Sequence, residues 1–240
     1  MGKVIVATSG KGGTGKSLFT ANLGALLAME GKRVVLIDMD MGLRNLDLYL
    51  GLESKVVYNV MDVLSGMCRI QQALVRDKRF ENLYLLASCP GPDLRDITTL
   101  HMKVLCAKLA AAFDYVLIDA PAGIGDGFML AAAPAQTAVI VTEAEYTSAR
   151  DADVVDQELI KMGITERYLV INKVRAELMS SGIVPGIQEI TQDLRLNVAG
   201  IIQYDDNIFI SGAKGVPIVM KRGTYIEENF RRIMERILHE

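Results

Sequence analysis

The stretch Ser9-Gly10-Lys11-Gly12-Gly13-Thr14-Gly15-Lys16-Ser17 decides the fold of this chain. It fits the pattern G-x-x-x-x-G-K-[ST], which forms a loop around phosphate groups. Its glycines allow the backbone to curl, so that successive N–H groups point at one anion. The apolar run Val4–Ala7 predicts a strand before the loop, and Leu18–Met29 predicts a helix after it. The positive end of that helix would face the same phosphate.

Each polar residue of this loop has an expected role. Lys16 is predicted to reach the β- and γ-phosphates, and the Ser17 hydroxyl is predicted to bind Mg²⁺. The loop from Gly10 to Leu18 as a whole is expected to contact the nucleotide. The alternative is a glycine-rich turn without a ligand, which the strand before the loop and the helix after it disfavour.

Lys11 places a second cation directly after the first glycine. Two lysines in one small cavity repel each other unless a polyanion sits between them or one points elsewhere. The pattern Lys11-Gly-Gly-x-Gly-Lys16-Ser17 resembles the deviant Walker A loop of the MinD/ParA family of ATPases. The resemblance implies that Lys11 reaches the γ-phosphate of a partner subunit, so that two ATP molecules are enclosed in a homodimer. Lys11 would then act in trans much as an arginine finger does. The alternative is a solvated loop lysine.

The length of 240 residues agrees with one α/β domain, and the resemblance implies a single P-loop ATPase domain over residues 1–240. Half of the residues are hydrophobic, which is ample for a covered sheet, and the net charge of −3 gives no bulk attraction to nucleic acid. The three cysteines form no C-x-x-C pair, so we expect a reduced cytoplasmic setting without disulfides or a zinc site. Neither a signal peptide nor a membrane-spanning run is predicted.

Apolar strands alternate with helical segments along the chain, which predicts an α/β fold. We expect a P-loop NTPase whose mainly parallel sheet has helices on both faces and binds ligands at the carboxyl ends of its strands. The predicted strands are 33–37, 83–86, 115–119, 138–141, 168–171 and 198–202, and the predicted later helices are 99–113, 148–162 and 224–240. Ser148 is the expected N-cap of the helix that it begins.

Asp38 and Asp40 follow the second predicted strand. They point to the same side if the strand is still extended there, and a carboxylate at that place can orient an attacking water. Alternatively, they cap the following turn. The string from Asp38 to Asp47 resembles switch I of the MinD branch of the family. The resemblance implies that Asp40 positions the hydrolytic water and that Asp38 supports the metal. It also places Asn45 in the nucleotide-responsive segment.

Asp119 ends another predicted strand and is the candidate Walker B carboxylate for Mg²⁺. The sequence Asp119-Ala120-Pro121-Ala122-Gly123 resembles the family's switch II, with Ala120 where serine is usual. Gly123 could donate its backbone N–H to a γ-phosphate and so sense hydrolysis. The alternative for this string is an ordinary turn.

Asn172 also stands at a predicted strand end, where the family uses an asparagine to read the adenine edge. An amide can both donate and accept there. The second wall of the base pocket in the family is an Ile-Pro-x-Asp segment. Here the segment is Ile202-Gln203-Tyr204-Asp205, so Gln203 replaces the proline.

The segment from Glu145 to Asp151 resembles the helix with which MinD-type proteins bind MinC and MinE. The resemblance implies MinC-like and MinE-like partners, with Glu145 and Asp151 as contact residues. A solvated acidic face is the alternative.

Family members also end in a basic helix at the inner face of the membrane, where they are peripheral. The stripe Ile226, Phe230, Ile233 instead accompanies a mixed polar face, so we expect it to pack on the sheet, with no separate membrane-targeting helix evident.

The leading hypothesis is an ATPase whose ATP-dependent dimer recruits partners in division-site placement and is reset by hydrolysis. A ParA-type DNA-partition ATPase is one rival, but such sequences read Asp-x-Asp-Pro-Gln where this chain reads Asp38-Met39-Asp40-Met41-Gly42. A nitrogenase iron protein is another, and it needs cluster-binding cysteines near switch II, which are absent after Asp119. A third rival is a scaffold or flagellar-number regulator that binds ATP but acts by docking.

Overall fold

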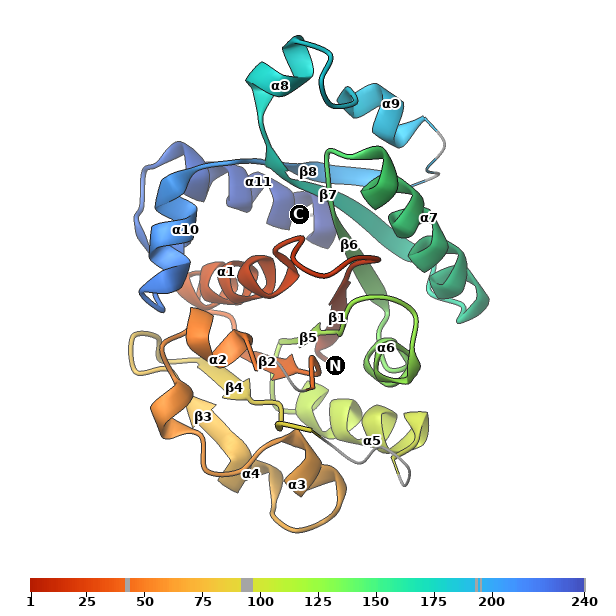
Figure 1. Cartoon of the computed structure of the whole chain (residues 1–240). Helices are drawn as coiled ribbons and strands as arrows, with labels where there is room; N and C mark the ends of the chain where they lie inside the picture. The colour runs from red at the N-terminus through yellow and green to blue at the C-terminus, as the bar shows by residue number, and fades with distance from the viewer. Residues whose placement is uncertain (42–43, 92–96, 193, 195, 240) are drawn as a thin grey trace.

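The computed structural model describes residues 1–41, 44–91, 97–192, 194 and 196–239. Its eight-stranded sheet has the order β3-β4-β2-β5-β1-β6-β7-β8 (Figure 1). Strand β3 pairs antiparallel with β4, whereas the other neighbours pair in parallel. The strands are β1 Lys3–Thr8, β2 Val34–Asp38, β3 Leu74–Arg76, β4 Leu83–Leu86, β5 Tyr115–Asp119, β6 Thr137–Glu143, β7 Glu166–Val174 and β8 Asn197–Gln203.

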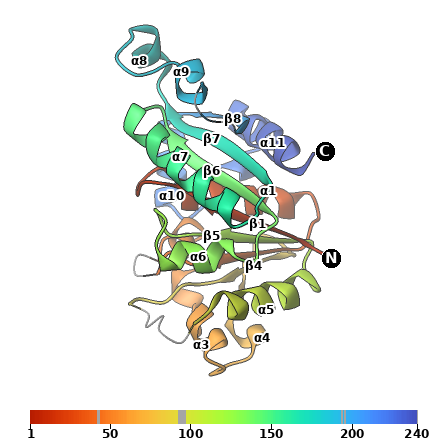
Figure 2. The same cartoon turned by 90° about the vertical axis from the view of Figure 1, so that its right-hand side faces the viewer.

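Helices cover both faces of this sheet, as the sequence predicts. They are α1 Lys16–Met29, α2 Leu46–Tyr49, α3 Val60–Leu64, α4 Ile70–Ala73, α5 Thr99–Ala110, α6 Asp126–Ala132, α7 Tyr146–Lys161, α8 Ala176–Ser180, α9 Ile187–Thr191, α10 Asp206–Ala213 and α11 Tyr225–Leu238. Helices α5, α6 and α7 lie on the face toward the viewer in Figure 2, and α1 and α11 lie behind the sheet. Because successive strand residues point to opposite faces, β1 contributes Val4 and Val6 to one core and Ile5 and Ala7 to the other. The predicted fold class is confirmed.

The order of the strands brings three strand ends together. Strand β5 lies between β1 and β2, with Asp119 opposite both Ala7 and Asp38 in the two registers. The phosphate loop follows β1 directly, so its residues face carboxylates from two neighbouring strands. This is the carboxyl edge of a parallel sheet, where ligands bind in open α/β folds.

Helix α11 packs on the sheet through the apolar stripe that the sequence predicts. The ring of Phe230 stacks on that of Phe19 from α1 with 6.1 Å between their centroids. A Cβ on Gly200 of β8 would lie 2.5 Å from Ile233 Cγ1, so this glycine lets the helix approach the strand. Among the described residues, no helix has the length and apolarity that a membrane crossing needs.

Some elements differ from the prediction. Strand β3 and helices α8, α9 and α10 are short segments without a clear period, and the sequence did not predict them. The N-cap prediction for Ser148 is wrong, because α7 begins at Tyr146 with Glu145 as its cap. Ala149 already donates its backbone N–H to the Glu145 carbonyl at 2.9 Å, so Ser148 lies inside the first turn.

Candidate functional site

A cavity of about 550 Å³ lies at the carboxyl edge of the sheet, around the phosphate loop. This volume is in the range of small-molecule sites. Residues from five parts of the chain line it: the loop (Ser9, Gly12, Gly13, Thr14, Gly15, Lys16, Ser17, Leu18), the predicted switch I and α2 (Asp40, Asn45, Tyr49), the predicted switch II (Pro121, Ala122), the end of β7 (Asn172, Lys173) and the end of β8 with the start of α10 (Gln203, Tyr204, Asp205, Ile208, Phe209).

The loop has the conformation that its glycines permit. Gly13 and Gly15 have φ values of 84° and 90°, in the left-handed region that favours glycine. Helix α1 begins at the next residue, Lys16, so its N-terminus opens on the cavity. The Thr14 hydroxyl is buried and has no hydrogen-bond partner. An orphaned buried hydroxyl is costly unless a ligand completes it, which fits a phosphate-binding loop.

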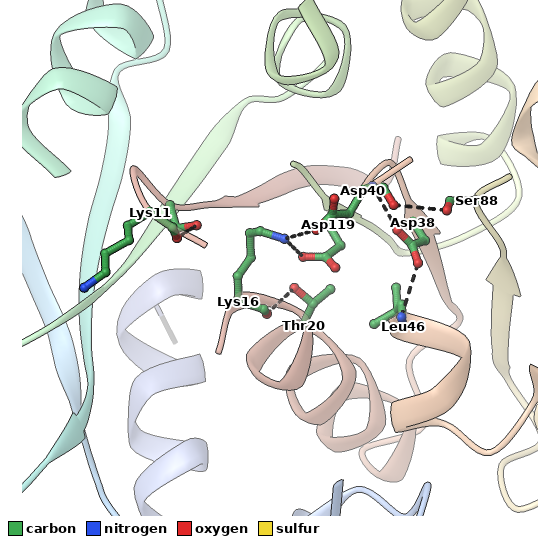
Figure 3. Close-up of polar contacts among 9 residues, drawn as sticks. Lys11, Lys16, Thr20, Asp38, Asp40, Leu46, Ser88 and Asp119 are labelled. Atoms are coloured by element: carbon green, nitrogen blue, oxygen red, sulfur yellow. Dashed lines mark hydrogen bonds and ion pairs between the residues drawn. The ribbon is translucent and has the colours of Figure 1, made fainter. Parts of the chain in front are cut away.

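Lys16 extends beneath the loop to two carboxylates (Figure 3). Its Nζ lies 3.0 Å from Asp119 Oδ1 and 3.6 Å from Asp40 Oδ2, and its side chain is 6% exposed. Burial alone would lower the pKa of Lys16, but Asp119 and Asp40 outweigh burial and raise the pKa. The ammonium therefore stays charged, ready to bind phosphate oxygens.

Asp119 and Asp38 are both buried at the strand ends. Burial raises the pKa of each carboxyl, and burial together with the charge of Asp119 raises the pKa of Asp38 to about 7. Asp38 accepts the backbone N–H groups of Asp40 at 2.9 Å and Leu46 at 3.2 Å, so here it caps the turn, as the alternative from the sequence proposed. Asp119 Oδ2 has no partner, whereas its Oδ1 accepts from Lys16. A cation or its water is the natural complement of such an oxygen.

Asp40 lies two residues past the end of β2, outside the paired strand. Its carboxylate nevertheless lines the cavity near Lys16. Asn45 lines the same cavity and precedes α2 as its N-cap residue. Gly42 and Leu43 of the predicted switch I lie outside the described residues.

Lys11 points away from Lys16 and from the carboxylates around it (Figure 3). Its Nζ lies 2.9 Å from Glu145 Oε2 at the start of α7. This hydrogen bond and the charge of Glu145 raise the pKa of Lys11, and Glu143 and Asp151 raise it further. The loop also touches α7 directly, because a Cβ on Gly10 would lie 2.4 Å from the Asp151 carbonyl oxygen. Both predicted partner-binding residues thus lie beside the early part of the loop.

Gly123 has a φ of 82° and donates its backbone N–H to the Ser9 carbonyl at 2.8 Å. Contact of this N–H with a phosphate would require that bond to break. The predicted switch II is therefore joined to the phosphate loop by a backbone hydrogen bond.

Asn172 lies against the phosphate loop, where its Nδ2 donates to the Thr14 carbonyl at 2.7 Å. The Gln203–Asp205 segment forms a wall of the same cavity, as the sequence predicts. Arg175 covers the outer wall, with its guanidinium 4.0 Å from the centre of the Tyr204 ring.

Sequence reasoning missed Lys173, Tyr49, Ile208 and Phe209 as lining residues. A signal for α10, which carries the last two, was available in Asp205-Asp206-Asn207, because Asp205 caps that helix by accepting from the Asn207 N–H.

The described residues contain no group of three His, Cys, Asp or Glu side chains that could hold a metal on its own. A Mg²⁺ bound with a nucleotide takes much of its coordination from phosphates and water, so one serine and one carboxylate are an adequate protein contribution. The Ser17 hydroxyl and the unpartnered Asp119 oxygen fit that requirement.

Known proteins share this architecture. The family described as the CobQ/CobB/MinD/ParA nucleotide binding domain matches residues 5–218. The septum site-determining protein MinD of Bacillus subtilis is 42% identical over 245 residues, which cover 100% of this chain and 90% of that protein. The structure of the MinC:MinD cell division protein complex of Aquifex aeolicus has a TM-score of 0.91 at 37% identity and covers 99% of this chain and 96% of that one. The structure of MinD from Pyrococcus horikoshii complexed with Mg-ADP has a TM-score of 0.88 at 27% identity. The match covers 99% of this chain and 96% of that one.

Proposed function

Because the chain belongs to the CobQ/CobB/MinD/ParA family and is an ATPase of its MinD branch, we propose that it acts as a nucleotide-dependent dimerisation switch in division-site placement. ATP forms the homodimer, the dimer recruits partner proteins, and hydrolysis to ADP and phosphate resets it. The observation that carries this proposal is the separation of the two loop lysines. Lys16 is buried beneath the loop, while Lys11 faces outward and pairs with Glu145.

The two lysines have complementary roles in this proposal. Lys16 and the loop N–H groups bind the phosphates of their own subunit. Lys11 exchanges Glu145 for a phosphate of the neighbouring subunit, because two cations are stabilised where a polyanion lies between them. Dimerisation and completion of the hydrolytic site are then one event.

The three carboxylates at the strand ends have different roles in this proposal. Ser17 and Asp119 would hold Mg²⁺, which would neutralise phosphate charge. Asp38 stands behind them and fixes the turn through the N–H groups of Asp40 and Leu46. Asp40 orients the attacking water beside Lys16. Asn172 and the wall that includes Gln203 receive the adenine base.

Two segments transmit the nucleotide state. Asn45 lines the cavity and is also the N-cap residue of α2, so a change at the nucleotide can move that helix. The Gly123 N–H leaves the Ser9 carbonyl and donates to the γ-phosphate instead. Such exchangeable contacts are the usual basis of switch segments in nucleotide-dependent proteins.

Partner recruitment occurs on α7, with Glu145 and Asp151 as contact residues. The match to MinD in a MinC:MinD complex supports a MinC-like partner. A MinE-like regulator would compete for the same helix. Release of Lys11 leaves the Glu145 carboxylate unpaired, so the dimer presents a more negative α7 than the monomer does. The protein is cytoplasmic in this proposal, and sedimentation with liposomes tests whether its dimer binds the inner face of the membrane.

Partner capture tests this function. A MinC-type protein immobilised on beads should retain the wild type with ATP and Mg²⁺ and release it with ADP. Asp40→Ala, which binds ATP but hydrolyses it slowly, should be retained longer. Sedimentation with anionic liposomes in the same two nucleotide states tests membrane contact. Equal capture in ATP and ADP would contradict a nucleotide switch, and an ATP-dependent shift on nonspecific DNA would favour the DNA-partition alternative.

A further inference from the structure

The end of β7 lies against the phosphate loop and binds two successive carbonyl groups of its backbone. Asn172 Nδ2 donates to the Thr14 carbonyl at 2.7 Å, and Lys173 Nζ donates to the Gly13 carbonyl at 2.5 Å. Consecutive residues of one strand thus hold consecutive carbonyls of the loop. We call these two contacts the β7 clamp.

Peptide geometry gives the clamp a consequence for anion binding. In a planar trans peptide the C=O of one residue and the N–H of the next point in opposite directions, and the described chain has no cis peptide bonds. Drawing the Gly13 and Thr14 carbonyls toward β7 therefore turns the N–H groups of Thr14 and Gly15 the other way. Residues 13 to 15 line the cavity. The β7 clamp therefore sets the direction in which the Thr14 and Gly15 N–H groups point.

The backbone of β7 is distorted in a way that serves this arrangement. Neighbouring residues of a regular strand point to opposite faces, so Asn172 and Lys173 could not both reach one loop. Lys173, however, has a φ of 55°, in the left-handed region, and the register with β8 shifts between Ile171 and Val174. A lysine held in this conformation is strained, and strain of this kind persists where surrounding contacts require it.

Further contacts hold both side chains in place. Glu143 Oε1 lies 2.8 Å from Lys173 Nζ and fixes the ammonium from the neighbouring strand β6. A Cβ on Gly15 would lie 2.2 Å from Asn172 Nδ2. Gly15 is therefore needed for the approach of Asn172 as well as for its own φ of 90°.

We propose that Lys173, together with Asn172, is a positioning residue of the phosphate loop, which preorganises the Thr14 and Gly15 N–H groups for the phosphates of a nucleotide. This inference rests on the proposed function only in taking the cavity as a nucleotide site. Lys173 acts through the Gly13 carbonyl, and its cationic charge is not what the phosphates require.

The test combines Mg·ADP affinity, measured by calorimetry, with the backbone amide NMR signals of Thr14 and Gly15 in nucleotide-free protein. Lys173→Met removes the donor and should weaken Mg·ADP binding about tenfold while shifting both amide signals. Lys173→Arg restores a donor and should recover most of the affinity. Lys161→Met is the matched control, because Lys161 forms an ion pair of 2.8 Å with Glu158 on the exposed face of α7.

A second variant separates binding from folding. Lys173→Gly removes the donor but relieves the backbone strain, so it should melt no lower than the wild type and still bind Mg·ADP weakly. Wild-type affinity in Lys173→Met would overturn the inference while leaving the proposed function intact. Weakened affinity with unmoved Thr14 and Gly15 signals would also overturn it, because Lys173 would then act directly on the ligand. A wild type that does not bind Mg·ADP would overturn both.

Discussion

Lys11 Nζ lies 2.9 Å from Glu145 Oε2, so the outward-facing cation of the phosphate loop is held by the first residue of the proposed partner surface. Lys11 must leave this carboxylate before it can reach a phosphate of a second subunit. In the proposed switch this ion pair would oppose dimerisation, so that one contact would couple the nucleotide state to the charge that α7 presents.

Glu145→Gln should strengthen ATP-dependent dimerisation, because an amide holds Lys11 less firmly than a carboxylate does. Both side chains are exposed, so we expect the dimer dissociation constant to fall by no more than about fivefold. Equilibrium sedimentation with ATP and Mg²⁺ measures it. Glu158→Gln, which removes the Lys161 ion pair from the same helix, is the control. A weaker dimer in Glu145→Gln would show that the carboxylate is required in the assembled state.

Asp40→Ala should lower the rate of ATP hydrolysis about 100-fold or more, because the residue that orients the water is lost. ATP affinity should change little, since Lys16 keeps its contact with Asp119 at 3.0 Å. Phosphate release and ATP binding, measured on the same samples, separate the two effects. Glu228→Gln, at an exposed carboxylate of α11, should change neither. Loss of ATP binding in Asp40→Ala would contradict the assigned role.

Phe230→Ala should destabilise the fold by about 3 to 5 kcal/mol, because it leaves a cavity where two rings now stack. Leu100→Ala, at a side chain on α5 that is 65% exposed, should change stability by less than about 0.5 kcal/mol. Urea unfolding of the two variants checks both values. A small effect at Phe230 would contradict the finding that the C-terminal stripe belongs to the core.

The cysteines should differ sharply in reactivity. Burial raises the pKa of Cys106 to about 12, so this thiol stays protonated and inaccessible as the pH rises from 7 to 9. Cys89 is also buried, whereas Cys68 is partly exposed. Alkylation of the native protein at pH 8, followed by mass spectrometry, should modify Cys68 first, and unfolding should expose all three. Equal rates at Cys68 and Cys106 would contradict this packing.

The local parts of this fold could be predicted from the sequence. The phosphate loop with its flanking strand and helix has a distinctive pattern, and the apolar strands that end in Asp38 and Asp119 mark the carboxyl edge of the sheet. Ser148 was mistaken for a cap because serine is favoured at that position, whereas the chain turns into α7 three residues earlier.

The contacts that join distant segments could not be predicted in this way. The partners Lys11 and Glu145 are 134 residues apart, and the Lys173 contact with Gly13 spans 160. These contacts depend on the order of strands in the sheet and on a left-handed residue in β7, neither of which has a periodic signal in the sequence. The same limit explains why Lys173 was missed and why Asn172 was assigned to the base alone.

The most direct test of the account is sedimentation velocity of the wild type and Lys11→Ala with Mg·ATP and with Mg·ADP, with Lys16→Ala as the variant expected to lose nucleotide binding. The wild type should be a dimer with ATP and a monomer with ADP. Lys11→Ala should bind ATP yet remain a monomer and hydrolyse it poorly. A Lys11→Ala protein that forms the ATP dimer at wild-type concentrations would contradict the proposal that this lysine serves a neighbouring subunit.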